Sequence, residues 1–205
     1  NEVLFHHMDG IEKSNILKKL NLLEGEYFVV SAHREENIDS EINFLKLVDV
    51  LNHIAEKYNF PVIVSTHPRT KKMIEKRKPE LDSLISLIEP VGFNDYNSLQ
   101  INSYVVLSDS GTISEESSIL NFRALNIRET HERLEAMEES SVILTGLKYD
   151  RIFQGIESLK SQNIGDKRNI LLVPEYSSPN VSIKMERIIL SYINYVNRVV
   201  WQKES

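Results

Sequence analysis

Short apolar runs alternate with segments of helical periodicity along most of the chain, and this alternation constrains the fold more than any other feature. Between two of the runs, apolar residues recur at helical spacing from Phe44 to Tyr58, and Ser40 precedes them as a candidate N-cap. Strands that alternate with helices indicate a parallel sheet with helices on both faces. The runs expected to form strands are residues 27–31, 62–65, 86–89, 104–108, 124–127 and 141–145.

The segments between these runs are expected to be helices or polar loops. Helices are predicted at residues 11–20, 40–58, 71–78, 96–103, after Gly111, and at 151–161 and 182–201. Residues 33–39 are expected to form a polar loop, and residues 163–180 resemble a linker.

Composition excludes several classes of protein. A chain of 205 residues with 41% hydrophobic residues is long enough for one full domain, or for one domain and an extension. It contains no cysteine, no secretory signal and no apolar run near the roughly 20 residues of a membrane-spanning helix. We therefore expect no membrane partner, and these features are consistent with a cytoplasmic location. The net charge of −6 argues against non-specific nucleic-acid binding, although an anionic small ligand needs only local positive potential.

Polar clusters follow four of the predicted strands. They lie at residues 33–37, 67–69, 109–116 and 128–135. Because ligands of parallel sheets bind beyond the carboxyl ends of the strands, we expect these clusters to meet at one edge.

The cluster that begins at Asp109 has the largest number of groups that could bind a ligand. Gly111 allows a tight turn and the close approach of an anion, and the free N–H groups of the following helical turn would face that anion. The hydroxyls of Ser110 and Thr112 would add donors for a diphosphate, and Glu116 is placed to accept bonds from ribose hydroxyls. The alternative is that Ser110 or Thr112 simply caps the helix and that the glutamate is solvated. These residues alone favour neither interpretation.

Other cofactor motifs are missing. The seven glycines form neither G-x-G-x-x-G nor G-x-x-x-x-G-K-[ST], so bound NAD, FAD and classical ATP hydrolysis lose support. His33 with Glu35 and Glu36 matches no standard metal-site spacing, and we expect no metal and no cofactor.

Three motifs in order give the sequence a specific resemblance. They are Ser-Ala-His-Arg-Glu-Glu-Asn at 31–37, Asp-Ser-Gly with Glu-Glu between 109 and 116, and Arg-Glu-Thr-His-Glu-Arg-Leu-Glu-Ala at 128–136. Over nearly all of its length the chain resembles the C-terminal half of the non-hydrolysing UDP-N-acetylglucosamine 2-epimerase family. Within that family it is most similar to the capsule-biosynthesis branch that forms UDP-N-acetyl-L-fucosamine.

The resemblance implies one half of a GT-B-type enzyme with two Rossmann-like domains and a cleft between them. Residues 1–22 would be a helical segment leading in from the absent N-terminal half, which agrees with a chain that begins at Asn1 without methionine. Residues 23–180 would form the nucleotide-binding domain, and residues 181–205 a helix that crosses to the other domain.

The resemblance also implies roles for individual residues. Ser110, Gly111 and Thr112 would contact the diphosphate, although Thr112 stands where many relatives have a second glycine. Glu116 would bind the ribose and Tyr96 would pack on the uracil. A further set is expected at the cleft: His33 as the catalytic histidine, and Arg34, Arg128 and Arg133 as possible cleft contacts.

The implied reaction is a 2-epimerisation of a UDP-N-acetylhexosamine in polysaccharide biosynthesis. A base would remove the proton at sugar C2 while UDP leaves C1, and UDP would add back after reprotonation from the other face. The acid and base carboxylates would lie mainly in the absent half, so the isolated chain is expected to be inactive, and the full-length enzyme is expected to be a homodimer. Two alternatives share the UDP-sugar ligand: the donor-binding domain of a GT-B glycosyltransferase, and a non-catalytic nucleotide-sugar sensor.

Overall fold

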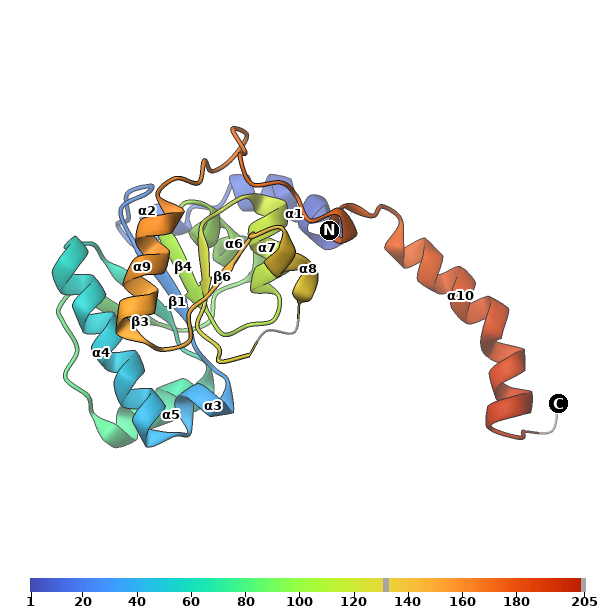
Figure 1. Ribbon diagram of the computed structural model, residues 1–205, viewed down its shortest axis with the longest axis horizontal. Helices are drawn as coiled ribbons and strands as arrows, with labels where there is room; N and C mark the ends of the chain where they lie inside the picture. Colours follow the sequence, from blue (N-terminus) through green and yellow to red (C-terminus); the bar gives the residue numbers. More distant parts are fainter. Residues whose placement is uncertain (131–132, 204–205) are drawn as a thin grey trace.

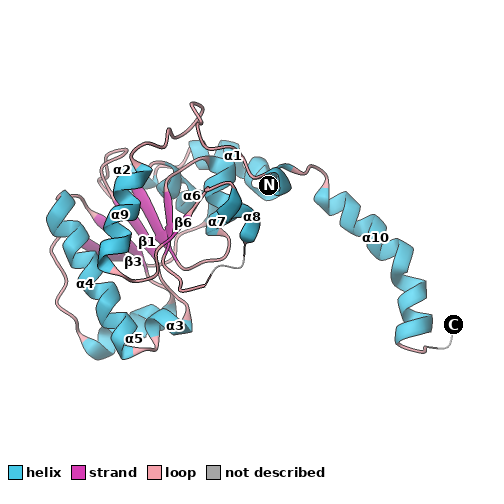
Figure 2. Ribbon diagram, viewed as in Figure 1, coloured by secondary structure: helices cyan, strands magenta, loops and turns pink. Residues whose placement is uncertain are grey.

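A single parallel sheet forms the centre of the molecule. The computed structural model describes residues 1–130 and 133–203, so His131 and Glu132 of the third motif lie outside the described residues. The six strands run in the order β3-β2-β1-β4-β5-β6, with β1 and β4 side by side in the middle (Figures 1 and 2). The predicted strands are confirmed to within two residues at each end: β1 (Phe28–Ser31), β2 (Val62–Ser65), β3 (Ile85–Ile88), β4 (Val105–Ser108), β5 (Ala124–Asn126) and β6 (Ile143–Leu144).

The register of β1 against β4 brings two of the polar loops together. Ser31 at the end of β1 lies opposite Ser108 at the end of β4, and every residue of the two strands is buried except Ser31, which is half-buried. The loops that follow, beginning at Ala32 and Asp109, therefore leave the sheet side by side.

Helices cover both faces of the sheet, as predicted, and each face has its own apolar core. One core includes Phe28, Val30 and Leu107 of the sheet, and the other includes Tyr27 and Val106. Against the first pack α3 (Glu35–Ile38), α4 (Glu41–Tyr58), α5 (Pro68–Arg77) and α9 (Tyr149–Leu159); against the second pack α1 (Glu2–Glu12), α2 (Ile16–Lys19), α6 (Phe93–Ile101) and α7 (Ile113–Leu120).

The prediction of one helix over residues 11–20 is wrong, because the chain turns between α1 and α2. The Ser14 hydroxyl accepts the N–H of Ile16 at 3.2 Å and donates to the Asp95 carboxylate at 2.6 Å. A serine bonded in this way favours a helix boundary over a helix interior.

Two further segments differ from the prediction. The polar loop at 33–39 contains the one-turn helix α3, and α8 (Leu134–Glu138) was not expected. Residues 163–180 have only a short 3₁₀ turn at Pro174–Ser177, as a linker would, yet they pack on the domain. Arg168 donates to the carbonyls of Ser118 (2.7 Å) and Ile119 (3.0 Å) at the end of α7, and Val173 is buried.

The C-terminal helix extends away from the rest of the molecule (Figure 1). Helix α10 (Val181–Tyr195) continues into a π-helical turn at Val196–Val200, which agrees with the predicted helix at 182–201. None of its residues is buried, although many are large and apolar, among them Ile188, Ile189, Leu190 and Ile193. In the described part of the chain, no helix has both the length and the apolar character needed to cross a membrane.

Candidate functional site

The strand order reverses between β1 and β4, and the polar loops meet at this point. To one side of β1 lie β2 and β3, and to the other side of β4 lie β5 and β6. In open parallel sheets such a reversal separates the two neighbouring loops and leaves a crevice where ligands bind. The predicted convergence of the clusters at 33–37 and 109–116 is therefore found at the place where the fold offers a site.

Asp109 joins these two loops. Its side chain is completely buried and accepts the backbone N–H groups of His33 (3.0 Å) and Arg34 (2.9 Å) and the side-chain amide of Asn37 (3.1 Å). The same carboxylate lies 3.1 Å from Nδ1 of His33, which leaves Nε2 as the free ring nitrogen. Asp109 thus begins α3 and fixes the orientation of the histidine, a role that the sequence analysis did not assign to it.

The loop from Ser110 to Thr112 leads into α7 with little capping. The Ser110 hydroxyl accepts the N–H of Thr112 at 3.3 Å and lies 3.0 Å from the Thr112 hydroxyl. The side chain of Thr112, the N-cap residue, accepts no backbone N–H of the first turn. Ser110 therefore occupies one N–H, whereas the first-turn N–H groups of α7 have no intrahelical partner and remain for a ligand.

Gly111 is open on its outer side. Its φ is not in the left-handed region, so the backbone conformation of the turn does not by itself require glycine. A Cβ atom at this position would have one neighbour within 4 Å, Nη2 of Arg34 at 3.8 Å. Within the described residues, the buried Nε of Arg34 has no hydrogen-bond partner. A guanidinium group thus lies beside a loop with free N–H donors, which is an arrangement suited to an anion.

Glu116, on α7, is partly buried and hydrogen-bonded. Its Oε2 accepts the side-chain amide of Gln100, on α6, at 2.9 Å, and the Thr112 hydroxyl donates to the same carboxylate. Burial raises the pKa of Glu116 above its ordinary value, and the two hydrogen bonds partly offset that effect. The solvated glutamate of the alternative interpretation is therefore not what the structure shows.

A cavity of about 290 Å³ adjoins His33 at the ends of β1, β2 and β3. The rings of His33 and His67 face it with their centroids 6.1 Å apart. Tyr96 packs partly into the core behind the cavity, and burial raises the pKa of its hydroxyl to about 12 although a hydrogen bond with Ser31 opposes the shift. The full lining is Ser31, His33, Ser65, His67, Pro90, Val91, Phe93 and Tyr96.

The other two predicted arginines are bonded to carboxylates of neighbouring helices. Arg128 is only 6% exposed, and its Nε lies 3.3 Å from Oε1 of Glu36. Arg133 is partly exposed and donates to Glu115 at 2.9 Å. Of the three candidate arginines, Arg34 is thus the one found beside Gly111.

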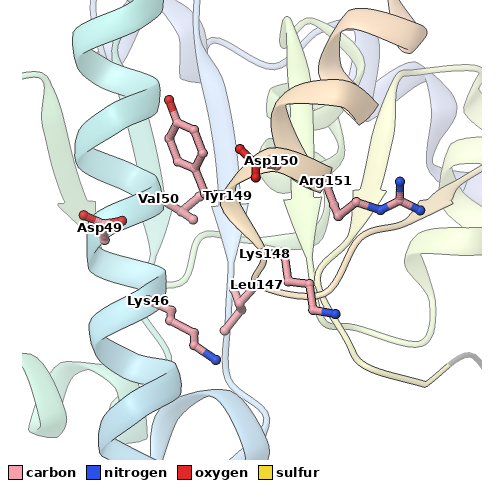
Figure 3. Close-up of a pocket in the computed structure, with 8 residues that line it drawn as sticks. All are labelled: Lys46, Asp49, Val50, Leu147, Lys148, Tyr149, Asp150 and Arg151. Carbon is pink, nitrogen blue, oxygen red and sulfur yellow. The ribbon is translucent and has the colours of Figure 1, made fainter.

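A larger cavity, of about 490 Å³, lies between α4 and the beginning of α9 (Figure 3). Lys46 and Asp49 of α4, Lys148 at the N-cap of α9, and Asp150 and Arg151 in its first turn give it mixed charge. None of the predicted site residues lines it. Within the described residues, no group of three histidine or acidic side chains is arranged to hold a metal ion.

Comparison with known proteins places the fold among sugar-nucleotide epimerases. A family model described as UDP-N-acetylglucosamine 2-epimerase matches residues 2–190. A curated UDP-N-acetylglucosamine 2-epimerase from Methanococcus maripaludis is 36% identical over 141 residues, which are 67% of this chain and 38% of that protein.

Solved structures agree. A UDP-N-acetylglucosamine 2-epimerase from Rickettsia bellii is 43% identical with a TM-score of 0.86, over 98% of this chain and 54% of that one. The Methanocaldococcus jannaschii enzyme, solved with UDP-GlcNAc and UDP, is 28% identical with a TM-score of 0.79, over 91% of this chain and 51% of that one. The chain thus spans about half the length of these relatives. Its Rossmann-like α/β fold, shared with GT-B-type epimerases, is confirmed.

Proposed function

The chain belongs to the UDP-N-acetylglucosamine 2-epimerase family, and from this premise we propose that it is the UDP-binding half of a UDP-N-acetylhexosamine 2-epimerase. The observation that supports this most strongly is the combination of Arg34, Gly111 and the uncapped start of α7 at the reversal of strand order. Free N–H groups and a guanidinium on one open surface match the needs of a diphosphate.

The remaining parts of UDP have partners along the same edge of the sheet. Ser110, Gly111 and Thr112 bind the diphosphate, and Glu116, six residues after Ser110, accepts hydrogen bonds from the ribose hydroxyls. The cavity beside His33 receives the base, with Tyr96 among its lining residues. A uridine placed in this way extends from the aromatic cavity towards the start of α7.

The same donors assist the reaction. When UDP leaves C1 of the sugar, negative charge grows on the diphosphate, and donors already aimed at it stabilise the transition state as well as the bound substrate. His33 acts beside that leaving group, and because its Nδ1 lies 3.1 Å from the Asp109 carboxylate, Nε2 is the ring nitrogen left for the ligand. Proton removal and return at C2 belong to carboxylates of the absent half, so this chain alone binds UDP and does not epimerise the sugar.

Helix α10 is the connection to that half. Its exposed residues include many large apolar ones, and exposed apolar surface of this kind marks a face that another surface covers. We assign residues 1–22 to a helical segment that leads in from the absent half and packs on the second core of this domain. Residues 23–180 are assigned to the nucleotide-binding domain, and residues 181–205 to a helix that crosses to the other domain. The fully exposed α10 supports this division.

We also assign the chain to one branch of the epimerase family. Thr112 stands where a second glycine is common, a substitution found in the branch that forms UDP-N-acetyl-L-fucosamine for capsules, and we assign the chain to that branch. A homodimeric full-length enzyme and a cytoplasmic location stay predictions.

Titration of UDP into the chain by calorimetry tests the binding role. Removal of a carboxylate that accepts two ribose hydroxyls forfeits hydrogen bonds worth roughly 1.5–3 kcal/mol, so Glu116→Ala is expected to weaken UDP binding about tenfold to a hundredfold. Glu186→Ala, on the exposed helix α10, is the control and is expected to bind UDP as the wild type does. Equal affinities for wild type and Glu116→Ala would refute the ribose role.

A further inference from the structure

Glu116 has a neutral partner, whereas the glutamate beside it has a cationic one. The side-chain amide of Gln100 donates to Oε2 of Glu116 at 2.9 Å across the contact between α6 and α7. Glu115, one residue earlier, pairs instead with the guanidinium of Arg133 at 2.9 Å. An amide holds a carboxylate in place without compensating its charge, so Glu116 keeps its capacity to accept further hydrogen bonds.

Core packing does not account for an amide at position 100. Gln100 is 1% exposed, and within the described residues its Oε1 has no hydrogen-bond partner. An unsatisfied buried acceptor is costly, and a methionine of similar length would fill the same space without one. The one contact of this side chain that an apolar residue cannot reproduce is its bond to Glu116.

Two buried hydrogen bonds fix the backbone of α6 at the position of Gln100. The Tyr27 hydroxyl donates to the carbonyl of Leu99 at 2.7 Å, and the Ser103 hydroxyl donates to the carbonyl of Gln100 at 2.8 Å. Both bonds are buried and involve residues that flank or include Gln100. The donor is therefore placed by the backbone of the helix rather than by a flexible loop.

We infer that Gln100 is a positioning residue for ribose recognition, whose amide fixes the Glu116 carboxylate so that its remaining lone pairs face the ribose hydroxyls. The inference rests on the proposed binding of UDP. It adds a residue that does not touch the ligand and that acts through Glu116.

The ratio of affinities for UDP and 2′,3′-dideoxy-UDP, measured by calorimetry, isolates this role. Both ligands have the same base and diphosphate, so the ratio reports only the bonds to the two hydroxyls. The wild type is expected to prefer UDP by about tenfold or more. In Gln100→Met the preference is expected to fall to within about threefold, because the carboxylate is no longer held in place.

Asn97→Leu is the matched control. Asn97 is also a buried amide of α6 whose oxygen has no hydrogen-bond partner among the described residues, but its amide donates to the carbonyl of Phe93 and not to Glu116. The ratio in this variant is expected to equal that of the wild type. An equal loss in Asn97→Leu and Gln100→Met would show a general effect of α6 packing and would overturn the positioning role.

Gln100→Glu gives a second readout that packing would not change. In this variant the introduced carboxyl group lies within hydrogen-bond distance of the Glu116 carboxyl group, and the two share a proton at low pH. The shared proton then takes the place of the hydrogen bond that the amide donates in the wild type. The preference for UDP is therefore expected to persist at pH 5 and to disappear as the pH rises and both groups ionise. A ratio independent of pH would overturn the inference, and this arm decides the question if Gln100→Met does not fold.

The two proposals fail in different ways. If the wild type does not bind UDP, or if Glu116→Ala keeps the full preference for UDP, the proposed function fails and the inference fails with it. If Glu116→Ala loses the preference while Gln100→Met retains it, only the positioning role of Gln100 is overturned.

Discussion

Asp109 shows how a single buried carboxylate organises the site. It replaces lost hydration with hydrogen bonds from the N–H groups of His33 and Arg34 and from the amide of Asn37. His33 and Arg34 immediately precede α3, and Asn37 lies within it, so the carboxylate sits at the N-terminal end of the helix, where the dipole also favours a negative charge. The same side chain therefore ends β4, starts α3 and orients the imidazole.

Glu116 is expected to make the free protein less stable at neutral pH. Its pKa is raised in the folded state by burial, so the folded state binds more protons than the unfolded one between the ordinary and the raised value. Stability therefore falls as the pH rises through that interval. Glu116→Gln keeps an acceptor for Gln100 without the buried charge, and it should raise the melting temperature at pH 7 by up to about 2–4 °C.

The comparison of melting curves at pH 4 and pH 7 checks this sign. At pH 4 the wild-type carboxyl is largely protonated, so the difference between wild type and Glu116→Gln should shrink. A melting temperature of Glu116→Gln below that of the wild type at pH 7 would contradict the assignment. So would a difference in melting temperature that is the same at pH 4 and pH 7.

Gly111 is expected to matter for binding and not for folding. An added methyl group meets only the end of Arg34 at ordinary contact distance, so Gly111→Ala should unfold at the wild-type temperature. The methyl would occupy the space where the diphosphate approaches, and UDP binding should weaken by about tenfold while uridine binding changes little.

Gly25→Ala is the matched control for that variant. Gly25 has a φ of +74°, where a side chain is strained, so this variant should lower the melting temperature without an effect on UDP affinity. Loss of stability in Gly111→Ala, or equal losses for UDP and uridine, would contradict the assignment of Gly111 to the diphosphate.

At the scale of elements, the strands and the long helix α4 followed from the sequence, whereas the short helices α2, α3 and α8 did not. The strands were predictable because each is an apolar run bounded by polar residues, and α4 because Ser40 accepts the N–H of Asn43 as an N-cap should. Helix α3 was not predictable, since its first turn depends on Asp109, far away in the sequence. The bond from Gln100 to Glu116 likewise joins two helices across 16 positions and leaves no periodic signal.

Some of the site residues were also predictable from the sequence, and others were not. The cluster from Ser110 to Glu116 was predictable because a polar turn after a buried strand marks the binding edge of a parallel sheet. The positions of the three arginine side chains were not predictable, because the sequence does not determine which of them forms an ion pair with a carboxylate. Arg34 lies beside Gly111, whereas Arg128 and Arg133 bond to Glu36 and Glu115.

Helix α10 is expected to be dispensable for the stability of the domain. It has no buried residue, so a chain that ends at Asn180 should melt within about 2 °C of the intact chain and bind UDP equally well. Light scattering should show less self-association, because exposed apolar surface promotes it. A fall in melting temperature of 10 °C or more, roughly 3 kcal/mol for a domain of this size, would show that α10 packs on the domain.

For the whole molecule, a complete cleft requires a second domain. The proposed UDP site lies on one open edge of the sheet, the exposed α10 needs a covering surface, and the relatives are about twice as long. These features agree with a leaving-group site in this chain and proton transfer in the other half. A GT-B glycosyltransferase would use a similar edge for its donor, and a sensor would use it for binding alone.

Incubation of the full-length protein with UDP-N-acetyl sugars in deuterated water tests this account most directly, with mass spectrometry and NMR at sugar C2 as the readout. Elimination and re-addition of UDP must exchange the C2 proton, so deuterium should enter C2 without any acceptor, while this chain alone should bind UDP and exchange nothing. Sugar transfer to an acceptor with no deuterium at C2, or tight binding with neither transfer nor exchange, would contradict the account.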